Sequence, residues 1–335
     1  MYKLIRNVGE SCFDDSIVLS QLDSAVELSV FELAACSFYQ RLVHPFLVPS
    51  SSTLLSLASF LILLSLASFL RFNHNMVRIA NLGSSFSAGP GIAPQVDIAA
   101  ARSGANYAHL LAERLGADLT DLSVSGATLL NITDTPQMSG GVTFPPQIQG
   151  VPEDADIVLV LGGGNDMSYV GGLFKEHTWA LAAFSLVQRL KGTPMPEFPA
   201  PADEEEVIKR LGKVLDAVHE KAPKARVIVV EYLTLLGSDV KPTVDVPFNA
   251  ERLEYHQGVA TNLQKATQQV VDSRSEWCER IPTAELSQSH GIGSAEPWVF
   301  GCSMMERLMG KAWYHPNGEG MKAVADLLHE RITSK

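Results

Sequence analysis

Four short segments of the chain contain residue types that can perform nucleophilic catalysis. They are residues 83–91 (Gly-Ser-Ser-Phe-Ser-Ala-Gly-Pro-Gly), 125–128 (Ser-Gly-Ala-Thr), 163–166 (Gly-Gly-Asn-Asp) and 313–317 (Trp-Tyr-His-Pro-Asn). The first contains Ser85 and the last contains His315. A serine hydroxyl is a poor nucleophile until an adjacent imidazole accepts its proton, so these two side chains would have to meet in the folded protein.

Each segment taken alone has another interpretation. A Gly/Ser-rich turn after a strand can cradle a phosphate, but residues 83–91 lack both the P-loop lysine and a complete G-x-G-x-x-G. They also lack the G-x-S-x-G elbow, because Ser87 stands where the second glycine is required. Ser85 could be a turn residue, Gly126 could permit a positive φ, and Asn165-Asp166 could cap a helix. Only the four segments together carry a specific signal.

The elements around these segments predict a parallel α/β sheet. Apolar strand-like runs at 77–82, 119–124, 155–161 and 225–233 alternate with helix-period segments at 105–115, 204–221, 250–272 and 317–332. This order predicts a three-layer α/β/α, flavodoxin-like domain. Ligands bind at the carboxyl ends of the strands in such sheets, so loops 83–94, 125–131 and 162–166 should meet at one edge.

Residues 76–335 resemble the SGNH hydrolases, also known as GDSL-like lipases and esterases, because the four segments follow in that family's order. The resemblance implies the SGNH fold and hydrolysis of a carboxylic ester through an acyl-serine intermediate. Ser85 matches the nucleophile and His315 the general base. The N–H groups of Ser85 and Gly126 and the Asn165 side chain match the oxyanion hole, in which a donor is worth about 10²–10³ in rate. The implied partner is a small-molecule ester, with no cofactor and no metal.

Two positions depart from the family pattern. Ser84 stands where the first segment usually has Asp, and Ala312 stands where Asp usually orients the histidine. Some relatives use a Ser–His dyad in which a main-chain carbonyl orients the ring, and we predict that the carbonyl of Ala312 does so here. Glu296 and Glu306 are alternative orienting groups. The alternative function is that of a non-catalytic SGNH-like protein that binds an ester or a glycan.

The substrate is less well determined than the reaction. An insertion at residues 167–203 begins as an apolar, helix-like stretch and ends in a proline-rich loop. Its apolar side chains either line an acyl pocket or lid, or pack an extra helix onto the core. Short- to medium-chain esters are expected first, with acetylated carbohydrates, lipids and transfer to an alcohol acceptor as alternatives. Trp298 is expected either to pack under the histidine loop or to line the acyl pocket.

Composition excludes nucleic acid as a partner. The formal net charge is −11, and no dense run of Lys or Arg offsets the resulting repulsion from phosphate backbones. No Cys/His cluster has the spacing of a zinc site. Cys278 and Cys302 either form a disulfide in an oxidising compartment or remain two separate thiols.

Residues 1–75 differ in character from the rest, and we separate them from the hydrolase domain at 76–335. Residues 54–70 are almost purely apolar, and the octet 54–61 recurs as 63–70. This run is at the short end of what spans a bilayer, roughly 17–25 residues. It is a membrane anchor, a buried helix, or part of an extension foreign to the natural protein. If translation starts at Met76, an intracellular enzyme is expected. If residues 1–75 belong to the natural protein, a single-pass membrane-anchored enzyme is expected.

Overall fold

The computed structural model describes residues 76–180, 190 and 203–334. The predictions for residues 1–75, including the apolar run 54–70 and the domain boundary, lie outside these residues, as does the proline-rich half of the insertion. Within the described ranges, no helix is both long and apolar enough to cross a membrane.

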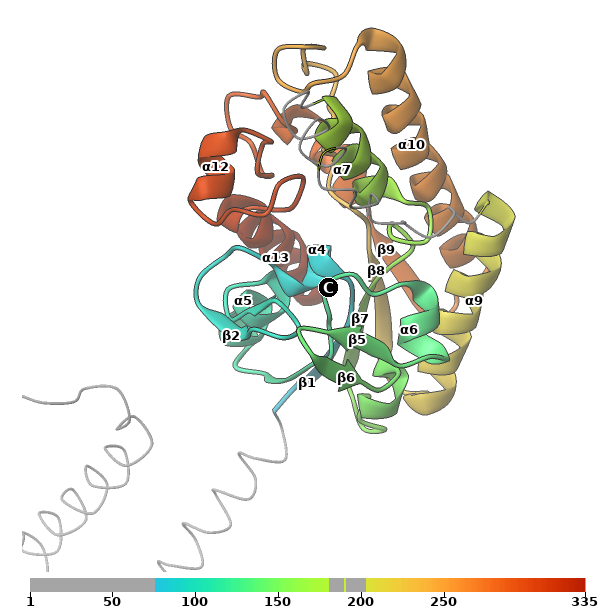
Figure 1. The fold of residues 1–335 in the computed structure, drawn as a ribbon. Coiled ribbons are helices and arrows are strands. Elements are labelled where there is room, and N and C mark those ends of the chain that lie inside the picture. Colours follow the sequence, from blue (N-terminus) through green and yellow to red (C-terminus); the bar gives the residue numbers. More distant parts are fainter. Residues whose placement is uncertain (1–75, 181–189, 191–202, 335) are drawn as a thin grey trace, which may run out of the picture. The chain divides into compact units, whose positions relative to one another are not determined.

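A five-stranded parallel sheet forms the centre of the domain, in the order β4-β1-β7-β8-β9 (Figure 1). The strands are β1 (Arg78–Gly83), β4 (Asp118–Asp121), β7 (Ile157–Leu161), β8 (Arg226–Val230) and β9 (Cys278–Ile281). Ile79 of β1 pairs with Leu119 on one side and with Ile157 on the other. The predicted α/β fold with a parallel sheet is confirmed. The strand order reverses between β1 and β7, which is where ligands bind in flavodoxin-like sheets.

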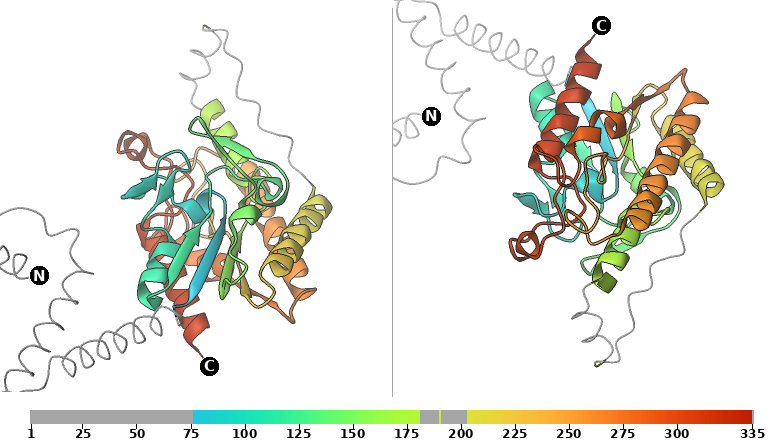
Figure 2. Two further views of the ribbon diagram at one scale, coloured as in Figure 1. Left: turned by 90° about the horizontal axis from the view of Figure 1, so that it is seen from below. Right: turned by 90° about the horizontal axis from the view of Figure 1, so that it is seen from above.

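Helices cover both faces of the sheet (Figure 2). On one face α5 (Tyr107–Leu115) packs against α13 (Gly318–Thr333). On the other face α9 (Glu204–Lys221) packs against both α6 (Leu129–Thr133) and α10 (Ala250–Asp272), and α7 (Tyr169–Ala180) packs against α10. Asparagine or aspartate side chains cap four of these helices, at Asn106, Asp203, Asn249 and Asn317. Such caps satisfy backbone N–H groups that have no partner within the helix.

One strand of the sheet was not predicted. In β9, buried Cys278 and Ile281 enclose Glu279 and Arg280, so the segment is too short and too charged to read as an apolar run. Ion pairs hold these charges in place: Glu279 meets an arginine on β8, and Arg280 lies 2.6 Å from Glu231. An edge strand exposes one side to solvent, which is why this composition is tolerated there.

The remaining elements are short and lie in the connections. They are α4 (Ser85–Ala88), β2 (Gln95–Asp97) with β3 (Arg102–Ser103), β5 (Gln137–Ser139) with β6 (Val142–Phe144), a 3₁₀ turn (Gln147–Gly150), α11 (Thr283–Leu286), a 3₁₀ turn (Gln288–His290) and α12 (Met304–Leu308). Cys278 and Cys302 are both free thiols, so the disulfide alternative is wrong.

Candidate active site

Ser85 begins the one-turn helix α4 directly after β1, and a buried glutamine fixes the residue at the end of that strand. Gln147 accepts a hydrogen bond from the N–H of Gly83 at 2.8 Å and donates one to its carbonyl at 3.0 Å. A Cβ atom on Gly83 would lie 2.7 Å from the carbonyl oxygen of Leu161 on β7, so only glycine fits. The position of Ser85 is therefore set by backbone contacts to the two central strands.

Ser84, in the position where the family usually has aspartate, forms a buried hydrogen bond. Its hydroxyl lies 2.8 Å from the Tyr232 hydroxyl, and its N–H donates to the Leu161 carbonyl. The Tyr232 ring packs on Phe86 with 4.7 Å between centroids. A neutral hydroxyl pair replaces a carboxylate here, which avoids burying a charge beside Ser85.

Hydrogen bonds connect the three predicted loops at one edge of the sheet. Val124 directly precedes the second loop, and its N–H donates to the Gly83 carbonyl at 3.1 Å. This bond ties the start of the second loop to the first loop. The Asn165 side-chain amide donates to the Ala127 carbonyl at 2.8 Å, which joins the third loop to the second. Asp166 accepts from the N–H of Leu129 at 2.9 Å. Gly126, Asn165 and Ser85 thus lie on mutually connected loops, as the sheet topology requires.

Asp166 also ties these loops to the helical layer. Its carboxylate is buried and lies 3.0 Å from the guanidinium of Arg210 on α9. Burial raises the pKa of Asp166, and the Leu129 N–H and the Arg210 cation oppose that rise. A buried carboxylate that loses its only cation is strongly destabilising, so this ion pair fixes the conformation of the third loop.

Three donor groups at this edge have unused hydrogen-bonding capacity. The N–H groups of Ser85 and Gly126 donate to no acceptor within the part of the chain that the structure describes. Gly126 has a φ of +84°, a conformation that favours glycine. The Asn165 amide uses one hydrogen for the Ala127 carbonyl and retains the other. Groups of this kind can bind an oxyanion.

His315 meets Ser85 in this structure, with 2.9 Å between its Nε2 and the Ser85 Oγ. The imidazole is half-buried and contacts Phe86, with 5.6 Å between ring centroids. Burial lowers the pKa of His315 to about 4, and a hydrogen bond to the Trp313 carbonyl opposes part of this shift. The ring is therefore neutral at pH 7 and can accept a proton.

The acceptor behind His315 is not the one predicted. The carbonyl of Trp313, and not that of Ala312, lies 2.7 Å from the His315 Nδ1. The intervening Tyr314 has a φ of +58°, which folds the backbone back so that the carbonyl two residues earlier faces the ring. A carbonyl can only accept, so Nδ1 carries the proton and Nε2 is left free to accept from Ser85.

Neither alternative carboxylate reaches His315 in the structure. Glu306 accepts from the N–H groups of Gly301 and Ser303 and thereby caps α12. Glu296 contributes its backbone carbonyl to the ring of His290. Trp298 stacks on the His290 ring, with centroids 4.0 Å apart, and its carbonyl accepts from the Asn317 N–H just after His315. The main chain next to it pairs with the histidine loop, since the Phe300 N–H donates to the His315 carbonyl.

Sequence reasoning missed Gln147, Tyr232 and the Trp313 carbonyl. Gln147 lies in a 3₁₀ turn outside all four segments, and no motif marks it. Tyr232 lies near the end of the predicted strand 225–233, where it is expected to be a core residue. The role of the Trp313 carbonyl as acceptor depends on the backbone conformation at Tyr314, which residue types do not reveal.

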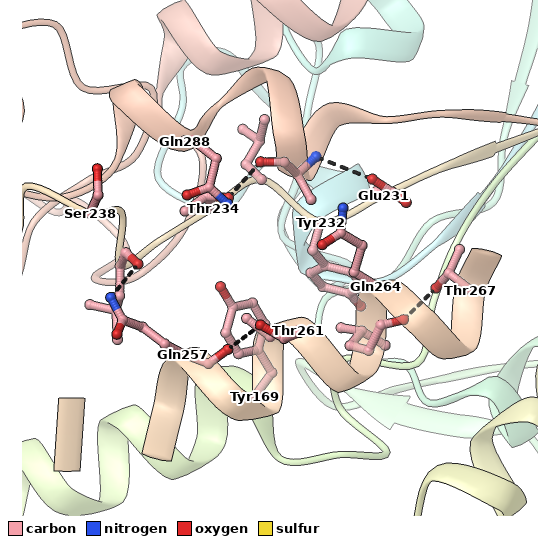
Figure 3. Close-up of a pocket in the computed structure, with 15 residues that line it drawn as sticks. Tyr169, Glu231, Tyr232, Thr234, Ser238, Gln257, Thr261, Gln264, Thr267 and Gln288 are labelled. Carbon is pink, nitrogen blue, oxygen red and sulfur yellow. Dashed lines mark hydrogen bonds between the residues drawn. The ribbon is translucent and has the colours of Figure 1, made fainter. Parts of the chain in front are cut away.

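A separate pocket lies between α10 and the segment that follows β8 (Figure 3). It has a volume of about 290 Å³, and Tyr169 and Tyr232 are among the residues that line it. Uncharged glutamine and threonine side chains form most of its polar lining: Thr234, Gln257, Thr261, Gln264, Thr267 and Gln288. Ser85, Gly126, Asn165 and His315 do not line it, so this pocket is distinct from the site of the Ser–His pair.

The helical half of the insertion packs onto the core. Met167, Tyr169, Val170 and Leu173 are all buried within the main apolar cluster. The packing interpretation therefore holds for these side chains, and they are not available as a free acyl pocket.

Comparisons with known proteins agree with the fold and the family. Residues 82–323 match the model of the GDSL-like Lipase/Acylhydrolase family. Lipase 2 of Streptomyces coelicolor is 26% identical over an alignment of 259 residues. The alignment covers 73% of this chain and 82% of that protein.

Two solved structures share the fold. The phospholipase A1 of Streptomyces albidoflavus has a TM-score of 0.59 at 19% identity, and the extracellular lipase of Streptomyces rimosus has 0.56 at 18%. Each match covers 76% of this chain and 99% of the other. The family match spans well over half of the sequence, and the chain therefore belongs to the GDSL-like lipase/acylhydrolase family and is an ester-hydrolysing enzyme.

Proposed function

We propose that this enzyme hydrolyses carboxylic esters through an acyl-serine intermediate, with Ser85 as nucleophile and His315 as general base. The observation that carries the proposal is the 2.9 Å contact between the Ser85 Oγ and the His315 Nε2. The ring is neutral and its Nδ1 proton is engaged by the Trp313 carbonyl, so Nε2 is the nitrogen free to take the serine proton. This pair needs no aspartate at position 312.

The reaction proceeds in two balanced halves. The Ser85 oxygen forms a bond to the ester carbonyl carbon as its proton passes to Nε2, and the resulting imidazolium returns that proton to the departing alcohol. Water then attacks the acyl-serine, gives its proton to Nε2, and the carboxylic acid leaves as Ser85 is re-protonated. In both halves the N–H groups of Ser85 and Gly126 and the free amide hydrogen of Asn165 stabilise the oxyanion.

The test is hydrolysis of p-nitrophenyl esters of increasing acyl length, combined with labelling by a serine-directed phosphonate. Turnover together with phosphonate label on Ser85 supports the proposal. The acyl length that is hydrolysed fastest indicates the size of the acyl-binding site. A folded protein that binds esters but shows neither turnover nor labelling would instead be the non-catalytic ester- or glycan-binding alternative, because labelling requires an activated serine.

Asn165→Ala should lower kcat by about 10²-fold with a smaller change in KM, because the lost donor acts mainly on charge that develops in the transition state. Steady-state kinetics on one p-nitrophenyl ester would measure this. The matched control is Asn249→Ala, which removes an asparagine that caps α10 and should leave kcat unchanged. Equal kcat in Asn165→Ala and the parent enzyme would remove Asn165 from the oxyanion hole.

The acid limb of kcat/KM should have its midpoint near pH 4, well below the ordinary histidine value. Only neutral His315 can accept the serine proton, and the neutral form predominates above a pKa that burial lowers to about 4. Activity should therefore rise through that pH and stay level from pH 6 to 7. A midpoint at about 6.5 would show that the imidazole titrates as in an unfolded peptide.

A further inference from the structure

The peptide group between Trp313 and Tyr314 contains the carbonyl that accepts from His315, and the backbone at this peptide group is strained. The Trp313 carbonyl belongs to this peptide group, so its direction depends on the φ of Tyr314, which is +58°. Bulky residues rarely adopt that conformation, because the Cβ crowds the backbone. Such a conformation persists only where surrounding contacts enforce it.

One side chain of α7, His177, stacks on one residue of this peptide group and hydrogen-bonds to the other. His177 of α7 stacks on the Trp313 ring, with centroids 4.5 Å apart and planes 18° apart. Its Nδ1 lies 2.7 Å from the Tyr314 hydroxyl. Both His177 and Tyr314 are buried, so this hydrogen bond is shielded from water. Burial also lowers the pKa of His177, which keeps the ring neutral and Nδ1 able to accept from the tyrosine.

Other contacts also position the two rings, but none combines a ring stack with a hydrogen bond. The Trp313 indole N–H donates to the Ser303 carbonyl at 2.8 Å. Phe174, one helical turn before His177, packs against both rings at about 6 Å. Among these neighbours only His177 combines a stack on one residue with a hydrogen bond to the other.

We propose that His177 is a positioning residue for catalysis: it holds the Trp313–Tyr314 peptide group so that the Trp313 carbonyl orients His315. This inference rests on the proposed Ser85–His315 chemistry and extends it to the insertion. In a chain with Ala312 in place of the family's aspartate, α7 supplies the rigidity that a carboxylate would otherwise provide. His177 of α7 thus acts on His315 through the side chains of Trp313 and Tyr314 and through the Trp313 carbonyl.

The decisive variant is His177→Phe, which keeps a ring stacked on Trp313 and removes the Nδ1 acceptor. We expect kcat to fall about tenfold with KM within about twofold, since one hydrogen bond that acts on the transition state has that effect. His177→Asn, whose Oδ1 replaces Nδ1, should recover part of the loss. Tyr314→Phe should lose about as much, and the double variant should lose no more than either single change, because both remove the same contact.

His219→Phe is the matched control, because His219 also stacks on a tryptophan, Trp277, with centroids 4.2 Å apart. It should leave kcat unchanged. The NMR resonance of the His315 Nδ1 proton gives a second readout, which should shift in His177→Phe and not in His219→Phe. Unchanged kcat and resonance in His177→Phe, or an equal change in His219→Phe, would overturn the proposal. Turnover by His315→Ala within tenfold of the parent enzyme would instead overturn the proposed function itself.

Discussion

Ser85→Ala should lower kcat on p-nitrophenyl esters by about 10⁴-fold or more, because it removes the atom that forms the covalent intermediate. The alanine fits without strain, since Ser85 is buried at the start of α4 and its hydroxyl hydrogen-bonds only with His315 among the described residues. The melting temperature should therefore stay close to that of the parent enzyme, and phosphonate labelling should disappear.

Ser84→Ala provides the contrast for this result. It removes the neighbouring hydroxyl and its buried bond to Tyr232, yet leaves Ser85 and its contact to His315 in place. We expect a loss of about tenfold or less, the effect of one hydrogen bond. If Ser84→Ala abolished turnover and labelling while Ser85→Ala remained active, the nucleophile would be assigned to the wrong serine.

His315→Ala should lower kcat by about 10⁴-fold as well, because a hydroxyl without a base stays protonated at pH 7. Combining it with Ser85→Ala should produce little further loss, because the two groups act as one unit. Residual hydrolysis in all three variants should be alike and should reflect the oxyanion donors alone. Kinetics at pH 7 on a single ester would measure each of these values.

The control for His315→Ala is His329→Ala, which changes another histidine within α13 and outside the site. It should retain full turnover. Adding free imidazole to His315→Ala gives a further check, because a small base that enters the vacated space can partly restore the rate. Activity of His315→Ala within tenfold of the parent enzyme would show that another group deprotonates the serine.

The sequence was sufficient to predict the fold class and to name candidate residues for the site. The short apolar runs 155–161 and 225–233, which alternate with helical segments, predicted buried strands of a parallel sheet. Helices α9 and α10 begin and end as their periodicity predicts. Because the carboxyl ends of parallel strands share one edge, the order of the segments sufficed to bring Ser85, Gly126 and Asn165 onto adjoining loops. These features depend on local pattern and topology, which residue types encode directly.

The way in which His315 is held depends on tertiary contacts. Whether Ala312 or Trp313 supplies the carbonyl depends on one dihedral angle at Tyr314, and contacts with His177 on a distant helix accompany that angle. The edge strand β9 and the Gln147 hydrogen bonds escaped prediction for a related reason. Charged edge residues and a lone polar side chain acquire their roles from partners far away in the chain, and no local pattern records such partners.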